Sequence, residues 1–269
     1  MQPLLRAENL VKRYPRKKLV SSGEDLLALD GVSFSVVQGT TLAIVGESGS
    51  GKSTLAFCLA GLERPTSGSI WFGDKDIAKL AEKDLRQVRP KIQLIFQDPA
   101  NSLNPRWNVL EILGEPMILQ GRTNRNEIRQ RAHTLLEKVG LSSELGERSP
   151  GELSGGQRQR LAIARALALE PEVLILDEAL SALDCSVQAQ IANLLMELQS
   201  SLGMTYLFIT HDLAMAAHLA DEIVVMNRGQ IVEQDPTEKI LKLPQHETTR
   251  QLLAAVPRLP RAAWPALEQ

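Results

Sequence analysis

The chain has 269 residues, which is enough for one large domain or two small ones. Hydrophobic residues make up 43% of it and charged residues 23%, which is ordinary for a globular protein and excludes collagen-like, disordered and disulfide-scaffold classes. Lysine and arginine (30) nearly balance aspartate and glutamate (32), so the net charge of -2 gives nucleic acid no overall attraction.

The two cysteines, Cys58 and Cys185, form neither a metal-ligand spacing nor a disulfide framework, which suits a reducing cytosol. Residues 1–18 carry charges where a signal peptide needs an apolar core. No apolar run approaches the ~18 residues that cross a bilayer. We therefore expect a soluble chain.

Residues 4–39 alternate in the manner of short strands around a charged loop at 15–25, and predict an antiparallel edge layer. After it, apolar runs at 40–46, 173–177 and 205–210 each lead into a turn and a helical pattern. This alternation predicts an α/β fold with a mainly parallel sheet. The run VLIL at 173–176 has no polar alternation, as expected for a strand covered on both faces.

Residues 98–160 are richer in charge and in helix formers, and predict a helical subdomain inserted into the sheet domain. From about residue 244 the sequence is punctuated by proline, which indicates a short helix and a tail. The predicted organisation is a sheet-containing core at 1–97 and 161–235, a helical subdomain at 98–160 and a C-terminal helix and tail at 236–269.

A glycine-rich motif, GESGSGKST, follows the first parallel strand and precedes a helix, as a phosphate-binding loop requires. Its residues are Gly46, Glu47, Ser48, Gly49, Ser50, Gly51, Lys52, Ser53 and Thr54. The glycines let backbone N–H groups and the helix N-terminus face a polyphosphate. Lys52 then reaches the β- and γ-phosphates, and Ser53 offers its hydroxyl to Mg²⁺.

Two carboxylates in succession end the buried run VLIL. Asp177 is placed to hold Mg²⁺ through water, and Glu178 lies one residue closer to the γ-phosphate. A carboxylate beside the attacking water is the general base that hydrolysis needs.

A second glycine motif, LSGGQ, precedes a helix whose apolar positions recur at helical spacing. Ser154, Gly155, Gly156 and Gln157 thus form a second helix N-terminus able to bind an anion, although a serine N-cap alone has the same pattern. One chain offers two phosphate sites, more than one triphosphate needs.

These motifs, with Tyr14, Gln97, the sequence SALD and His211, occur in the order and approximate spacing of the ATP-binding cassette (ABC) ATPases. The chain resembles that family over about residues 4–235. The resemblance implies that two cassettes pack head to tail, with each ATP between one chain's phosphate loop and the other's LSGGQ. It also implies that Tyr14 stacks on adenine and that Gln97 touches Mg²⁺ and senses the membrane partner. His211 would hold the γ-phosphate and the attacking water, and Asp184 would bridge the two cassettes.

Within that family, the stretch from Asp98 to Arg106 and the sequence HETTRQLLAAVP resemble importers of oligopeptides, dipeptides and nickel. The chain differs from many importer ATPases in having Ala179 where they have proline. Some members of the subfamily carry several cysteines near the C-terminus, and residues 236–269 contain none. The resemblance favours a heterodimer with a second ABC ATPase, although a homodimer also fits the motifs.

We expect from this resemblance an ATPase that uses ATP and Mg²⁺ to drive a transporter. Its partners would be two transmembrane permease subunits and, indirectly, an extracytoplasmic substrate-binding protein. The chain would lie at the cytoplasmic face of the inner membrane. The cargo stays open between peptides, nickel and metal-chelate complexes.

Three other classes share part of the pattern. A chromosome-maintenance or DNA-repair ATPase needs a long heptad insertion that residues 55–152 lack, and a tandem translation factor needs a second phosphate loop. A nucleotide kinase explains GESGSGKST but not LSGGQ. An ABC ATPase of another transporter type, or one outside transport, is the remaining alternative.

Overall fold

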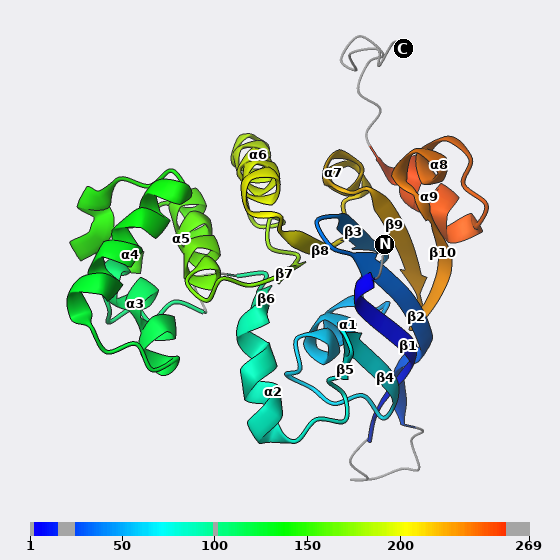
Figure 1. Ribbon diagram of the computed structural model, residues 1–269. Coiled ribbons are helices and arrows are strands. Elements are labelled where there is room, and N and C mark those ends of the chain that lie inside the picture. The colour runs from blue at the N-terminus through cyan, green and yellow to red at the C-terminus, as the bar shows by residue number, and fades with distance from the viewer. Residues whose placement is uncertain (1–2, 16–24, 99–101, 257–269) are drawn as a thin grey trace, which may run out of the picture.

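Two β-sheets form the framework of the chain in a computed structural model, which describes residues 3–15, 25–98 and 102–256 (Figure 1). Most of the predicted charged loop (16–24), part of the subfamily-like stretch (99–101) and the C-terminal tail (257–269) lie outside the described residues.

The smaller sheet is antiparallel and has the order β2-β1-β4-β5. Its strands are β1 (Pro3–Tyr14), β2 (Leu26–Val37), β4 (Ser67–Phe72) and β5 (Lys75–Asp76). The predicted antiparallel layer is therefore confirmed. Strands β4 and β5 were not part of that expectation, and they extend the layer by two strands.

The larger sheet has the order β10-β9-β3-β8-β7-β6 and is parallel except for β10. Its strands are β3 (Thr41–Val45), β6 (Ile92–Ile95), β7 (Val173–Asp177), β8 (Thr205–Thr210), β9 (Glu222–Asn227) and β10 (Gln230–Pro236). The predicted α/β fold with a mainly parallel sheet is confirmed.

Both faces of the larger sheet are covered, which explains why its central strands lack polar alternation. Along β7, Val173 and Ile175 face the core shared with the smaller sheet and α1 (Lys52–Leu59). Leu174 and Leu176 face the core shared with α5 (Gly155–Leu167) and α6 (Cys185–Leu202). Every residue of β7 is buried.

The predicted helical subdomain contains α3 (Val109–Leu119) and α4 (Arg125–Lys138), which pack on α5 at one side of the molecule (Figure 1). Helix α5 runs through residue 160, so the predicted boundary between subdomain and core lies within a helix. This helix contacts α3 and α4 as well as β6, and its apolar face belongs to both units.

The remaining helices flank the sheets. They are α2 (Glu82–Val88), α7 (Leu213–Leu219), α8 (Thr237–Lys242) and α9 (Glu247–Ala255). The C-terminal region thus has two helices where the sequence predicted one. Among the described residues, no helix combines the length and the apolar character that crossing a membrane requires.

A buried carboxylate fixes the C-terminal helix to the sheet. Glu233 of β10 accepts hydrogen bonds from the backbone N–H groups of Gln245 (2.8 Å) and His246 (2.9 Å) and from the hydroxyl of Thr249. Burial alone would raise the pKa of Glu233, but these hydrogen bonds lower it overall.

We predict that Glu233→Gln destabilises the fold by about 1–3 kcal/mol at pH 7, because an amide NH₂ replaces an acceptor facing buried donors. The folded pKa of Glu233 lies below its unfolded value of about 4.3, so its stabilisation is present above that value and disappears as the pH falls through the folded pKa. Thermal unfolding of both proteins between pH 7 and pH 3 should therefore show the difference shrinking. The exposed Glu238→Gln is the control, and an equal loss from both variants would contradict this role of Glu233.

Candidate functional site

The candidate site lies at the carboxyl edge of the larger sheet, where β3, β8 and β7 are neighbours. Val45 at the end of β3 pairs with Thr210, and Asp177 at the end of β7 pairs with Ile209. Because parallel strands end at the same edge, the phosphate loop, the two carboxylates and the residue after β8 are brought together there.

Tight backbone packing explains the glycines of the phosphate loop. A Cβ at Gly46 would lie 2.3 Å from the carbonyl oxygen of Met226, so a side chain there would collide with main chain. Gly51 has φ +102°, and its Cβ would lie 2.4 Å from the carbonyl oxygen of Ala28. The two glycines therefore allow a tight turn immediately before α1. The helix begins at Lys52, and its first N–H groups have no partner within the helix and can face a ligand.

The Lys52 ammonium is held by the loop itself. It donates to the carbonyl oxygens of Gly46 and Glu47, at 2.8 Å each, and lies 3.4 Å from the hydroxyl of Ser50. Burial lowers the pKa of Lys52, while the charges of Glu178 and Asp177 act in the opposite direction. The structure thus places a buried cation inside the predicted phosphate cradle.

Oxygen donors from three segments meet beside the loop. The Ser53 hydroxyl lies 3.2 Å from Asp177 Oδ1, and both residues line a cavity of about 450 Å³ together with Gln97. Burial raises the pKa of Asp177, and the bond from Ser53 partly offsets this. The predicted metal ligands are therefore on one cavity wall.

Glu178 and His211 lie side by side. Glu178 has φ +47°, a conformation that a residue with a side chain rarely adopts, and its N–H donates to Ile209 O at 2.8 Å. His211 Nδ1 is 3.7 Å from Glu178 Oε1, and both residues line a small cavity of about 60 Å³. The Ser181 hydroxyl donates to the carbonyl oxygen of Glu178 at 2.8 Å, a contact that the sequence SALD did not reveal.

The LSGGQ motif forms the predicted helix N-terminus. Ser154 is the N-cap of α5: its hydroxyl accepts from Gln157 N at 3.2 Å, and its own N–H donates to Gln157 Oε1 at 2.9 Å. Within the part of the chain that the structure describes, no hydrogen bond joins this motif to the phosphate loop. The helix starts at Lys52 and Gly155 thus belong to different elements, α1 and α5.

The glycines of LSGGQ pack on the segment that contains Asp184. A Cβ at Gly155 would lie 3.5 Å from Leu183, and one at Gly156 would lie 2.7 Å from Val187 Cγ1 of α6. Asp184 immediately precedes α6. Sequence analysis missed Val187, because only the packing of α5 on α6 reveals it.

The other singled-out residues lie in different places. Tyr14 ends β1, and its hydroxyl donates to Glu63 at 2.5 Å. Cys58 is buried in α1, and burial raises the pKa of its thiol to about 11, so it is inert at neutral pH. Cys185 is exposed at the start of α6.

A glycine-rich loop between a parallel strand and a helix, with paired carboxylates on a neighbouring strand, defines the P-loop class of nucleoside triphosphatases.

Comparison with known proteins narrows this class. A family model described as "ABC transporter" matches residues 29–181. The dipeptide transport ATP-binding protein DppF of Escherichia coli (strain K12) is 48% identical over 259 residues, which cover 96% of this chain and 78% of that protein. The oligopeptide transport ATP-binding protein OppD of Mycobacterium tuberculosis is 47% identical over 95% of this chain and 42% of that protein.

A solved structure agrees with these matches. The ATP-binding cassette MJ0796, a dimer in a post-hydrolysis state bound to ADP and Pi, has a TM-score of 0.77 at 31% identity over 87% of this chain and 98% of its own. This chain belongs to the ABC transporter family.

The spacing between α5 and α6 yields a prediction. Gly156→Ala should destabilise the fold by about 1–3 kcal/mol, because the added methyl meets the stiff, β-branched Val187. Gly155→Ala, which makes only ordinary contact, is the matched control, and Val187→Ala should restore the stability of the Gly156→Ala protein. Thermal unfolding measures all of these, and equal melting temperatures for the two alanine variants would contradict the packing argument.

Proposed function

We propose that this chain is the ATP-hydrolysing subunit of a membrane transporter that imports peptides. The observation that carries the proposal is the presence of two helices that begin at glycine-rich motifs in one chain, α1 after the phosphate loop and α5 after Ser154. Each helix start can bind a phosphate group. One triphosphate needs only the first, so the second serves a nucleotide held by another cassette. The names of the relatives DppF and OppD support a peptide cargo over nickel or a metal chelate.

ATP binding begins with the phosphates. The N–H groups of residues 46–54 and the start of α1 face the phosphate chain, and the Lys52 ammonium exchanges its two carbonyl partners for phosphate oxygens. Tyr14 stacks on the adenine. Burial of Lys52 strengthens its attraction for the phosphates, because the surrounding dielectric is low.

Ser53, Asp177 and Gln97 fit a magnesium ion bound with the nucleotide. They offer a hydroxyl, a carboxylate and an amide oxygen to one cavity, and hard oxygen donors are the ligands that Mg²⁺ prefers. When bound, the ion would neutralise charge on the phosphate oxygens during transfer to water.

Hydrolysis is assigned to Glu178 and His211. Glu178 takes the proton of the attacking water, and its position is fixed by the bond from its own N–H to Ile209 O. His211, whose Nδ1 lies 3.7 Å from Glu178 Oε1, contacts the γ-phosphate and orients the water.

The second cassette completes each site. Ser154, Gly155, Gly156 and Gln157 present the N-terminus of α5 to the γ-phosphate of the nucleotide on the opposite chain, and Asp184 bridges the two chains. The Ser154 hydroxyl accepts the N-cap bond from Gln157 N and can still donate its own hydrogen to a phosphate oxygen. The dimeric state of MJ0796 supports this arrangement.

Two substitutions separate binding from hydrolysis. Lys52→Ala should weaken ATP binding about 10-fold or more, because it removes the charge on the β- and γ-phosphates. Glu178→Gln should leave ATP binding intact and lower the hydrolysis rate about 10²- to 10⁴-fold, because the amide accepts no proton. Calorimetry and phosphate release in the assembled transporter measure the two effects. Hydrolysis by Glu178→Gln at the parental rate would rule out this base.

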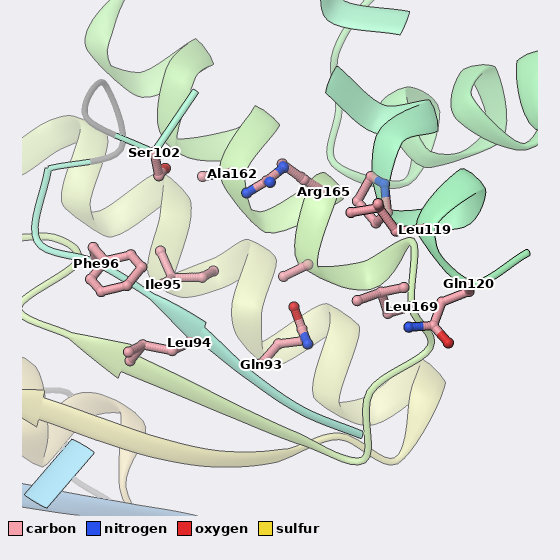
Figure 2. Close-up of a pocket in the computed structure, with 12 residues that line it drawn as sticks. Gln93, Leu94, Ile95, Phe96, Ser102, Leu119, Gln120, Ala162, Arg165 and Leu169 are labelled. Atoms are coloured by element: carbon pink, nitrogen blue, oxygen red, sulfur yellow. The ribbon is translucent and has the colours of Figure 1, made fainter. Parts of the chain in front are cut away.

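The permease subunits dock beside the helical subdomain. A cavity of about 180 Å³ lies between the edge strand β6, α3 and α5, and Gln93 and Arg165 extend into it (Figure 2). Leu119 at its rim is 76% exposed, and Phe96 is 41% exposed. This groove and the adjacent Gln97 receive a coupling helix of the membrane chain, which holds the ATPase at the cytoplasmic face of the membrane.

The second ATPase is a different chain in this proposal. The sequence of the C-terminal region lacks the cysteines of some subfamily members, which suits one member of a pair. The core at 1–97 and 161–235 binds nucleotide, the subdomain at 98–160 contacts the permease, and the C-terminal segment from residue 236 contributes α8 and α9. A substrate-binding protein outside the membrane delivers the peptide.

Native mass spectrometry of the complex purified from membranes should find one copy of this chain, one of a second ATPase and two permease subunits. Leu119→Asp should release this chain from the complex, because it puts a charge on the apolar rim of the groove. The control is Leu243→Asp, because Leu243 is also exposed, at 64%, but lies in the C-terminal region. Two copies of this chain with no other ATPase would refute the heterodimer and leave the ATPase assignment standing.

A further inference from the structure

A cluster of Lys12, Tyr14 and Glu63 joins the end of β1 to the segment after α1. The Tyr14 hydroxyl donates to Glu63 Oε2 at 2.5 Å, and Lys12 Nζ lies 3.0 Å from the same oxygen. The Lys12 ammonium also lies 4.9 Å from the centre of the Tyr14 ring. The proposed function uses Tyr14 alone and assigns nothing to the other two.

This cluster, the tyrosine clamp, connects Tyr14 to both ends of the phosphate-loop helix. Thr54, in the first turn of α1, lowers the pKa of Tyr14 and so partly offsets the effects of burial and Glu63. Glu63, in the segment after the helix, accepts the hydrogen bond of the Tyr14 hydroxyl. Lys12 also donates to the carbonyl oxygen of Arg64 at 2.8 Å. The ring is therefore fixed relative to the helix whose N-terminus faces the phosphates.

The charges of the clamp are partly shielded from water. The Lys12 side chain is 15% exposed and that of Glu63 is 32% exposed, so this pair is less screened than a surface pair. The hydrogen bond from Tyr14 lowers the pKa of Glu63. The pKa of Tyr14 is raised, mainly by burial and to a smaller extent by the same hydrogen bond. At neutral pH the carboxylate and the phenol therefore both keep the protonation state that the bond requires.

We propose that Glu63 and Lys12 are positioning residues for the nucleotide base, which hold the Tyr14 ring where it stacks on adenine. The inference rests on the proposed function, which places adenine on Tyr14. A ring fixed in advance loses little rotational freedom when the base binds, and affinity rises accordingly. Tyr14 is half-buried, so part of its ring stays accessible, and Glu63 balances the charge of Lys12 beside it.

The chain contains a matched cluster away from the site. Trp71 Nε1 donates to Glu8 Oε2 at 2.9 Å, Arg6 Nε lies 3.1 Å from Glu8 Oε1, and the Arg6 guanidinium lies 5.4 Å from the Trp71 ring. A cation, a carboxylate and an aromatic ring thus meet between β1 and β4, as they do in the tyrosine clamp. The proposed function places no ligand there. Glu8→Ala removes a comparable carboxylate, on β1, and serves as the control for Glu63→Ala.

The test compares ATP with inorganic tripolyphosphate, which has the phosphates but no base. By calorimetry on the full chain, Glu63→Ala and Lys12→Met should each weaken ATP binding about 3- to 10-fold and leave tripolyphosphate binding unchanged. Glu63→Gln, which still accepts the Tyr14 hydrogen bond, should recover part of the loss. In a Tyr14→Ala background, Glu63→Ala should have no further effect, because the ring it positions is gone.

Several outcomes would overturn the clamp. Equal losses for ATP and tripolyphosphate would show a general effect on the phosphate loop, and tighter ATP binding by Lys12→Met would show that Lys12 competes with the base. An ATP affinity unchanged by Tyr14→Ala would remove the base from this ring while leaving the ATPase assignment intact. Failure of the unmodified chain to bind ATP would instead refute the proposed function itself.

Discussion

The parallel register of β3, β8 and β7 is the constraint on which the site depends. In the proposed mechanism the phosphate loop follows β3, His211 follows β8, and Asp177 ends β7. The pairing of Val45 with Thr210 and of Asp177 with Ile209 brings these strand ends to one edge. The pairing is enforced by burial on both faces, since a shift of one residue would turn the apolar side chains of β7 to the wrong core. Packing far from any ligand therefore sets the position of the reacting groups.

Local motifs made much of this predictable from sequence. GESGSGKST, LSGGQ and VLILDE are contiguous, so each carries its own turn or strand context, and the structure places them as expected. Buried apolar runs such as β7 revealed a covered parallel sheet without further information. The P-loop and the N-cap at Ser154 are local structures, which is why short segments sufficed.

What the sequence did not reveal depends on contacts between distant residues. Glu63 lies 49 residues from Tyr14, and no pattern along the chain links the two. The contact of Gly156 with Val187 depends on how α5 crosses α6, and the role of Glu233 depends on where α9 returns to the sheet. The subdomain boundary was harder for the same reason: α5 is one continuous helix whose apolar face packs on both units.

The contacts of Lys52 affect the free-energy cost of releasing a nucleotide and binding the next one. With two carbonyl oxygens at 2.8 Å, its buried ammonium has partners of its own before any phosphate arrives. An unpaired buried cation would cost several kcal/mol, about the scale on which a loop unfolds locally. Under the proposed function, phosphate oxygens replace these two carbonyl oxygens when ATP binds, and the carbonyl oxygens replace them again on release. The ammonium would then stay paired throughout the cycle, and the loop would stay folded between nucleotides.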